Sequence, residues 1–237
     1  MKPRLTHPLL FIASDRREAE PWVAHWDNPR PLTLPVHWAR AGKWRGRDMI
    51  ALANGVGRQR AVLAVEAGRM VADSFSGICS IGSVRALDPS LGISDIIVAT
   101  EVTDARSSWP ALDPHGSAAR SGIVHSSLHI ARTSEEKRKL NQSGAILVEM
   151  EAAGVARSAH ELAVPFYCVR VVSDLANETF VTDFENFLSP DGKFDVPRLI
   201  MYSLAHPVSG LPELLRLQRR TSEAARQLGG YLADCNF

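Results

Sequence analysis

Two stretches of the chain place carboxylates where a buried strand is expected to end. Glu149 and Glu151 flank Met150 where an apolar run gives way to a helical pattern, and Asp174 follows the apolar run 165–172. An acid at the carboxyl end of a strand is well placed to act on a ligand. The alternative is that these acids only begin helices, where the helix dipole favours negative charge.

Short apolar runs and helical patterns alternate along the chain. Uninterrupted apolar runs are typical of strands that are covered on both faces, and the helical patterns place small and apolar residues on one stripe. This alternation predicts an α/β fold: a single-domain, three-layer αβα sandwich with a mixed, largely buried central sheet. The expected strands are 9–13, 49–53, 77–81, 95–100, 145–148 and 165–172, and the expected helices include 60–72 and 152–162.

Two polar stretches are expected to be loops, and neither marks a domain boundary. Residues 104–122 are rich in Ser, Pro, Asp and Gly, whereas residues 176–195 mix polar residues with Phe180, Phe184 and Phe187. The second stretch suits a lid over an apolar ligand, or a surface connection whose aromatic side chains cover the core. We therefore predict one domain over residues 1–237.

The composition argues against several classes of protein. The 27 Lys and Arg residues nearly balance the 26 Asp and Glu residues, so no strong field favours nucleic acid. The three cysteines are far apart and form no pair that is typical of zinc or redox chemistry. The first apolar segment is too short for a signal peptide, and no run reaches the roughly 18 residues of a membrane span. We expect a reduced, cytoplasmic protein.

The motifs around the carboxylates resemble the nucleoside phosphorylase and nucleosidase superfamily, especially the methylthioadenosine/S-adenosylhomocysteine nucleosidases. That family carries a V-E-M-E-A motif, a helix, a V-P-F strand and then Arg-x-x-Ser-Asp, and all of these stand between residues 148 and 174. The resemblance extends to a glycine turn at 54–57, to Ile81-Gly82-Ser83 and to an F-x-x-F lid at 184–187. It implies a phosphorylase/hydrolase-like fold and an enzyme that cleaves the N-glycosidic bond of a purine nucleoside.

The resemblance also implies a role for each matching residue. Asp174 is expected to be the general acid that protonates the purine, with Ser173 orienting it. The pKa of Asp174 must be raised for that task. Glu151 is expected to bind the ribose hydroxyls while Met150 packs on the sugar. The remaining substrate-binding residues predicted among these motifs are Ser83, Glu149 and Arg170.

The glutamate that activates water is expected shortly after the first strand. We select Glu18, and Asp15 and Glu20 stay as rivals because a solvated helix start would account for all three acids. Arg170 is expected to position acidic groups near the site, or to form a plain salt bridge.

Two further positions match the family's contacts to the base. His129 and Ile130 fall where the family stacks an aromatic and an aliphatic residue. His125 stands four residues before His129, and a helical pair of histidines could bind a metal, but no third ligand is apparent. We predict stacking or packing at these positions, with no metal and no cofactor.

One segment departs from the family pattern. Where the family usually carries G-S-A-G-G or G-x-A-G-G, this chain has Gly82-Ser83-Val84-Arg85-Ala86. The change could narrow the site or place a cation near a phosphate or sugar oxygen. Bacterial purine phosphorylases carry an arginine at the position of Ser80, so we favour water as the nucleophile. Phosphate stays open as a co-substrate, with Arg58, Arg60 or Arg85 as its ligands.

A narrower resemblance links the chain to the hopanoid-associated branch of the superfamily. Residues 87–91 and the tail 206–220 match that branch, which is thought to remove adenine from adenosylhopane, a membrane lipid precursor. We therefore expect hydrolytic release of adenine from a 5′-substituted adenosine of that kind. The alternatives are a methylthioadenosine/S-adenosylhomocysteine nucleosidase, a phosphate-dependent purine nucleoside phosphorylase and a nucleoside-binding protein without turnover.

The tail and the family together suggest partners. An amphipathic helix is expected over 212–228, with Pro212 in its first turn and Gly229-Gly230 as its stop signal. Its apolar stripe would pack on the sheet or on a partner subunit. The alternative is an interfacial helix that holds the enzyme at the inner face of a membrane. The family implies a homo-oligomer, and no nucleic-acid partner is expected.

Overall fold

The strands and helices of the computed structural model follow the alternation that the sequence predicts. The model describes residues 4–237. The strands are β1 (Leu9–Ala13), β2 (Asp27–Pro31), β3 (Trp38–Trp44), β4 (Arg47–Ala53), β5 (Gly77–Ala86), β6 (Ile96–Thr103), β7 (Ser108–Pro110), β8 (Arg120–Ser126), β9 (Ala145–Glu149) and β10 (Phe166–Asp174). The helices are α1 (Arg16–Val23), α2 (Arg58–Gly68), α3 (Ser134–Asn141), α4 (Ala152–Glu161), the 3₁₀ turn η1 (Phe184–Phe187), α5 (Val196–Ala205) and α6 (Gly210–Asp234).

All ten strands form one mixed sheet, as expected. Its order is β10-β6-β8-β9-β5-β1-β4-β3-β2, with β7 paired to β6. Strand β10 pairs with β6 and also with β5, so β5, β9, β8, β6 and β10 close into a ring. The remaining strands, β1, β4, β3 and β2, extend from this ring as an open sheet. The sequence pattern does not reveal this closure.

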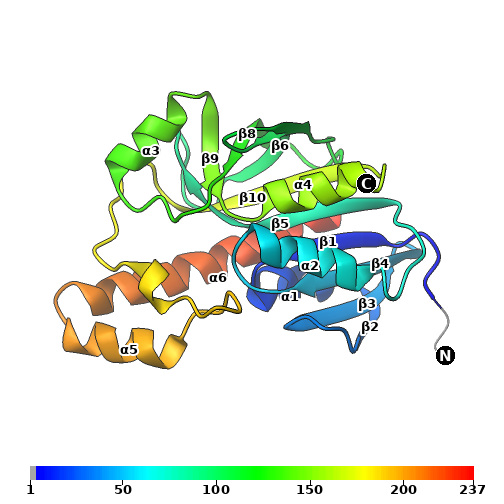
Figure 1. Ribbon diagram of the computed structural model, residues 1–237, viewed down its shortest axis with the longest axis horizontal. Helices are drawn as coiled ribbons and strands as arrows, with labels where there is room; N and C mark the ends of the chain where they lie inside the picture. Colours follow the sequence, from blue (N-terminus) through cyan, green and yellow to red (C-terminus); the bar gives the residue numbers. More distant parts are fainter. Residues whose placement is uncertain (1–3) are drawn as a thin grey trace.

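Helices cover both faces of the sheet, which confirms the predicted three layers. Helices α2 and α4 lie together against β1, β4, β5 and β10. Helices α1 and α6 pack on each other and on strands β4, β5 and β10 from the opposite side. In Figure 1, α5 and the first turns of α6 extend beyond the sheet as a helical hairpin.

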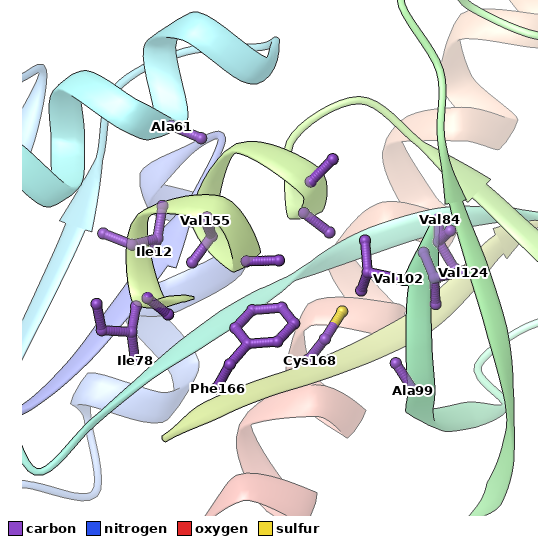
Figure 2. Close-up of a cluster of buried hydrophobic side chains, with 14 of the residues drawn as sticks. Ile12, Ala61, Ile78, Val84, Ala99, Val102, Val124, Val155, Phe166 and Cys168 are labelled. Atoms are coloured by element: carbon purple, nitrogen blue, oxygen red, sulfur yellow. The ribbon is translucent and has the colours of Figure 1, made fainter. Parts of the chain in front are cut away.

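The core on the α2 and α4 side consists of small and branched side chains. Figure 2 shows Val155 on α4 pointing toward the strands that carry Ile12, Ile78 and Phe166. Helix α4 is rich in alanine and glycine, which allows it to lie close to the sheet. Its Gly154 sits so near α2 that an added Cβ would lie 2.5 Å from the Arg58 carbonyl oxygen.

The predicted strands are present, with β1 matching its expected bounds. Strand β5 runs five residues past its predicted end, to Ala86, and β10 continues to Asp174. The loop expected at 104–122 contains β7 and the start of β8. Strands β2 and β3 were not predicted. The residues of β2 are exposed and lack an apolar pattern, and the apolar residues of β3 are interrupted by Arg, Gly and Lys.

The tail helix differs most from its prediction. Helix α6 begins at Gly210, close to the expected start, but passes through Gly229 and Gly230 to Asp234. Gly229 allows a close helix crossing: an added Cβ would lie 2.8 Å from the backbone of Pro21 in α1. This glycine therefore serves packing and does not end the helix. Within residues 4–237, no helix combines the length and apolar character needed to cross a membrane.

Candidate functional site

A cavity of about 700 Å³ opens at the carboxyl ends of β1, β4, β5 and β10. This volume lies within the range of sites for small organic ligands. The position agrees with the expectation that ligands of α/β folds bind beyond these strand ends. Its lining includes eight predicted site residues, Glu18, Ser83, Ile130, Glu149, Met150, Glu151, Ser173 and Asp174.

Glu18 occupies one end of this cavity, which we call the Glu18 end. It lies in the first turn of α1, and its Oε2 accepts hydrogen bonds from the Ser14 N–H (3.1 Å) and hydroxyl (2.8 Å). Its Oε1 accepts from the Ser83 N–H (2.8 Å) and hydroxyl. Both predicted residues, Glu18 and Ser83, are therefore in direct contact. The carboxylate is fixed in place by backbone and side-chain donors.

The glycine before Ser83 makes this contact possible. Gly82 has φ +150°, and an added Cβ would lie 3.0 Å from both carboxylate oxygens of Glu18.

The two other acids considered for activating water, Asp15 and Glu20, are placed differently. Asp15 also borders the cavity, but its carboxylate caps α1 and binds Arg17. Glu20 faces away on the exposed side of α1, near Arg16.

Glu149 and Glu151 lie between the two ends of the cavity and have different surroundings. Glu149 Oε2 is buried and accepts from the Glu151 N–H (2.9 Å), the Ala152 N–H (2.8 Å) and Arg170 Nη2 (2.7 Å). Glu149 therefore organises the turn from β9 to α4. Glu151 is only partly buried, and its Oε1 accepts from the Gly57 N–H (2.7 Å). The glycine turn singled out in the sequence thus positions Glu151.

Burial and a neighbouring carboxylate both affect the titration of Glu151. Burial, followed by the charge of Glu149, raises the pKa of Glu151 to about 8, although the Gly57 hydrogen bond and Arg170 oppose the shift. This shift favours a protonated Glu151 side chain near neutral pH.

Asp174 marks the opposite end of the cavity, the Asp174 end, where two cations approach its carboxyl group. Lys137 Nζ donates to Oδ1 at 2.9 Å, and Arg85 Nε lies 3.0 Å from Oδ2. Lys137 is completely buried and also donates to the carbonyl oxygens of Leu175 (2.7 Å) and Glu178 (2.9 Å). Burial raises the pKa of Asp174, as the predicted role requires, while Arg85 and Lys137 oppose the shift.

A β-bulge brings Asp174 opposite Arg85. Along the β10–β5 ladder, Val172 pairs with Val84, but the next partner of Arg85 is Asp174 because the register shifts at Ser173. Ser173 itself is buried, and its hydroxyl lies 3.4 Å from the Val84 carbonyl oxygen. It does not hydrogen-bond the Asp174 carboxyl group, so the orienting role expected of Ser173 is wrong in this structure.

The segment expected to be a lid covers the cavity and also forms a small core of its own. Phe180 and Phe184 line the cavity, and Phe187 packs edge-on against Tyr202 of α5, with ring centroids 5.3 Å apart. The segment is fastened to the glycine turn, since the Val56 N–H donates to the Gly192 carbonyl oxygen at 2.8 Å. The segment therefore lies where a lid would lie, and its action on a ligand stays a prediction.

Three other predictions have distinct outcomes. Ile130 borders the cavity, whereas His129 does not: its side chain is 83% exposed and lies beside Glu185. The expected stacking by His129 is therefore wrong here, because the loop after β8 turns its ring outward. His125 lies within β8, so the two histidines do not share a helix. Arg170 is buried against Glu149 and Ser80, which confirms its contact with an acid.

Two of the three arginines considered as phosphate ligands, Arg58 and Arg60, form contacts away from the cavity, whereas Arg85 borders it. Arg58 pairs with Asp104 at 2.8 Å, and Arg60 binds the backbone and side chain of Asn54. Neither borders the cavity. Between residues 4 and 237, no cluster of three His, Cys, Asp or Glu side chains is arranged to hold a metal ion.

Lys137 is the site residue that sequence reasoning missed. It belongs to the run Ser134-Glu135-Glu136-Lys137-Arg138-Lys139, which looks like a solvated helix. Nothing in that pattern distinguishes the buried Lys137 from the exposed Lys139. The placement of Arg85 was open in the sequence, and the structure assigns this residue to the Asp174 end.

Comparisons with known proteins agree with this fold and with the resemblance found in the sequence. The family model of the phosphorylase superfamily matches residues 115–189. A 5′-methylthioadenosine/S-adenosylhomocysteine nucleosidase from Pseudoalteromonas translucida is 26% identical over 194 residues, which cover 68% of this chain and 81% of the relative. A nucleosidase of the same name from Staphylococcus aureus is 27% identical over 179 residues, 62% of this chain and 77% of the relative.

Solved structures show that the fold is shared along nearly the whole chain. The Neisseria meningitidis 5′-methylthioadenosine/S-adenosylhomocysteine nucleosidase in complex with methylthio-immucillin-A superposes with a TM-score of 0.71, at 19% identity and 97% coverage of both chains. Futalosine hydrolase of Helicobacter pylori gives a TM-score of 0.70 at 15% identity, covering 96% of each chain. The chain thus has the α/β fold of these nucleosidases and resembles the nucleoside phosphorylase and nucleosidase superfamily.

Proposed function

We propose that the protein cleaves the N-glycosidic bond of a purine nucleoside by hydrolysis. One observation carries the proposal: a single cavity holds Glu18 at one end, Asp174 at the other and Glu151 between them. Glycosidic bond cleavage uses a base that activates water and a group that assists the leaving base on the opposite side. The names of the relatives and structural neighbours support the same chemistry.

Each carboxyl group has a separate task in this proposal. Glu18 takes a proton from the attacking water, and its bonds to Ser14 and Ser83 keep its oxygens directed at one point. Glu151 accepts hydrogen bonds from the ribose hydroxyls, while Met150 packs on the sugar. Asp174 assists the departure of the purine, as the general acid that the resemblance implies, with Ile130 against the base.

The surroundings of the Glu18 end favour water over phosphate. A phosphate ion needs several cationic or N–H donors. Here the donors of Ser83 already bind the Glu18 carboxylate, whose negative charge would repel the ion. Ser80 stands where bacterial purine phosphorylases carry arginine, and its hydroxyl accepts from Arg170.

One part of the cavity would lie beyond the sugar of a bound nucleoside. Its lining favours an apolar substituent on the 5′ carbon. Phe184, Phe194, Leu199, Leu214 and Leu217 border this part of the cavity, between the lid and the α5–α6 hairpin. Such a surface binds a hydrocarbon better than the charged amino-acid group of S-adenosylhomocysteine. We therefore place adenine nucleosides with an apolar 5′ group, of the adenosylhopane type, ahead of S-adenosylhomocysteine.

A lipid-like substrate also implies where the enzyme works. The outer surface of α5 exposes Ile200, Met201 and Leu204, and Val208 follows in the turn to α6. We name these four residues the α5 face. In our proposal a cytoplasmic enzyme touches the membrane surface through the α5 face. The homo-oligomer implied by the family stays a prediction.

A panel of substrates tests the proposal. Adenine release is measured for adenosines whose 5′ group is methylthio, a longer alkylthio chain or homocysteine, with and without phosphate. We expect release without phosphate and a kcat/KM that rises with alkyl length. No release from any member would contradict the proposed function, and a preference for homocysteine would contradict the apolar subsite.

A further inference from the structure

Lys137 of α3 carries a positive charge that is completely buried. Lysine is almost never fully buried unless its charge is paired. Two residues further along the same helix, the side chain of Lys139 is 69% exposed and pairs with Glu135. Because burial of a charge costs free energy unless partners replace water, the partners of Lys137 indicate what the residue does.

The partners of Lys137 all lie where the chain leaves β10. Its Nζ donates to Asp174 Oδ1 (2.9 Å) and to the carbonyl oxygens of Leu175 (2.7 Å) and Glu178 (2.9 Å). Figure 1 shows this part of the chain passing beside α3 before it reaches η1 and α5. An ammonium group has three donors and no acceptor, so no donor of Lys137 is left for a ligand. Lys137 therefore acts on the protein around the acid and not on the substrate.

The segment that follows Asp174 is also fastened to α6. Arg220 Nη1 donates to the Glu178 carboxylate at 2.8 Å. Glu213 accepts from the N–H groups of Val181 and Thr182, each at 2.9 Å. These contacts hold the segment but do not include the Asp174 carboxyl group. The contact of Lys137 includes both, so it joins the acid to the start of the lid segment.

A general acid must keep its carboxyl group in a fixed orientation as well as hold a proton. The carboxyl group of an aspartate can rotate about the bond from Cβ to Cγ, and a hydrogen bond from a fixed donor to one oxygen opposes this rotation. Lys137 is such a donor, because its own position is fixed by the two carbonyl oxygens. It orients Asp174 through Oδ1.

We propose that Lys137 is a positioning residue, which holds the Asp174 carboxyl group and the start of the lid segment in the arrangement that protonates the leaving purine. This inference rests on the proposed function. As the bond from C1′ to N9 breaks, its electron pair moves into the purine, and the proton of Asp174 passes to the purine. Water forms the new bond to C1′ and gives its proton to Glu18. Exchange with solvent then restores both carboxyl groups, and Lys137 keeps its three protons throughout.

A double-mutant cycle on kcat tests this role. Adenine release from 5′-methylthioadenosine is measured for the wild type, Lys137→Met, Asp174→Asn and the double variant. We expect kcat to fall by about 10²–10⁴-fold in Asp174→Asn and by about 10-fold or more in Lys137→Met. In the Asp174→Asn background, Lys137→Met should lower kcat by only about twofold or less, because the group that it positions is gone. An equal loss in both backgrounds would make the role of Lys137 purely structural and would overturn the inference.

The pH dependence of kcat gives a second readout. In the complex the ribose hydroxyls occupy Glu151, so the alkaline limb of kcat reports the loss of the proton from Asp174. Arg85 and Lys137 lower the pKa of Asp174 against the effect of burial, whereas Glu178 raises it. Loss of the Lys137 charge should therefore raise this pKa and move the alkaline limb to higher pH. An unchanged limb in Lys137→Met would contradict the inference.

Two further proteins separate the possible failures. Lys137→Gln retains N–H donors but not the charge, and it should move the limb in the same direction even where Lys137→Met is poorly folded. The matched control is Lys139→Met in α3, which should leave kcat and the limb unchanged. An equal loss of kcat in the control would attribute the effect to α3 and overturn the inference. If the wild type releases no adenine, the proposed function is wrong, whereas an active wild type with an additive cycle overturns only the role of Lys137.

Discussion

At the scale of single residues, the candidate site consists of carboxyl groups that have different surroundings. Glu18 accepts hydrogen bonds from neutral donors. Glu151 is desolvated and lies near the negative charge of Glu149. Asp174 lies between the cations Arg85 and Lys137. Environments that differ in this way allow similar side chains to act as base, ligand and partner of the leaving group. The different surroundings of Glu18 and Glu151 predict different effects of replacing each residue.

Replacing Glu18 tests the activation of water. We expect Glu18→Gln to lower kcat by about 10²–10⁴-fold, because the amide cannot take a proton from water. KM should change little, since Glu18 does not bind the base or the sugar. The matched control is Glu20→Gln on the exposed side of α1, which should retain normal turnover. An equal loss of kcat in both variants would attribute the effect to a disturbance of α1 and not to the Glu18 carboxylate.

The raised pKa of Glu151 predicts a dependence of stability on pH. Its pKa is about 8 in the folded protein, against 4.5 for the ordinary side chain. Between these values the folded protein holds a proton that the unfolded chain has released. The free energy of unfolding contributed by Glu151 is therefore full below about pH 4.5 and is lost as the pH rises toward 8. Urea unfolding at several pH values should show a shallower fall for Glu151→Gln than for the wild type. Parallel curves would mean that Glu151 titrates normally.

The carboxylates could be predicted from the sequence, whereas the cations beside Asp174 could not. Glu149, Glu151 and Asp174 stand in local motifs at strand ends, so a linear pattern reveals them. Lys137 reaches Asp174 from a helix 37 residues earlier in the chain. Arg85 faces Asp174 only because the ladder shifts register at Ser173. Contacts that depend on tertiary packing and on a bulge leave no local pattern.

At the scale of elements, the lid and the glycine turn meet through backbone groups. Gly192 has φ +76°, and an added Cβ would lie 2.8 Å from the Val56 carbonyl oxygen and 2.9 Å from its nitrogen. The phenylalanines predicted from the sequence that this segment lies over a ligand site, but they gave no indication of what fastens it. A local pattern also misled the prediction of the tail helix. The pattern predicts a stop signal at Gly229, but this glycine lies inside α6 and allows close packing against α1.

Replacing Gly192 tests whether this fastening matters for binding. We expect Gly192→Ala to push the lid away from the turn and to raise KM about 10-fold, with a smaller effect on kcat. Gly46→Ala is the matched control, because Gly46 has a similar φ of +80° but nothing within 4 Å of an added Cβ. Both variants carry the same backbone strain. An equal rise in KM for the two would attribute the effect to strain and remove the role of the fastening.

At the scale of the whole molecule, the two halves of α6 have different environments. Ala224, Leu228 and Leu232 are completely buried in the core beside α1, while the first turns extend with α5 beyond the sheet. The stripe predicted from the tail sequence is therefore mostly structural. The proposed membrane contact therefore relies on the α5 face. Removal of the chain from Pro212 onward would expose the core.

The α5 face can be tested without disturbing the core. We expect the wild type to co-sediment with anionic liposomes at low salt and a Met201→Lys/Leu204→Lys variant to stay in the supernatant. Both side chains are largely exposed, at 71% and 60%, so the variant should melt at nearly the wild-type temperature. Co-sedimentation of both proteins to the same extent would exclude the α5 face. Retention of both in the supernatant would remove the proposed membrane contact.

The fate of the sugar tests the central claim most directly. Purified protein is incubated with 5′-methylthioadenosine in buffer without phosphate and in the same buffer with phosphate, and the products are identified by mass spectrometry. The arrangement of Glu18, Ser83 and Ser80 predicts equal rates of adenine release in both buffers, with the free 5-methylthio sugar as the only second product. Turnover that requires phosphate and yields the sugar 1-phosphate would contradict hydrolysis and the role of Glu18.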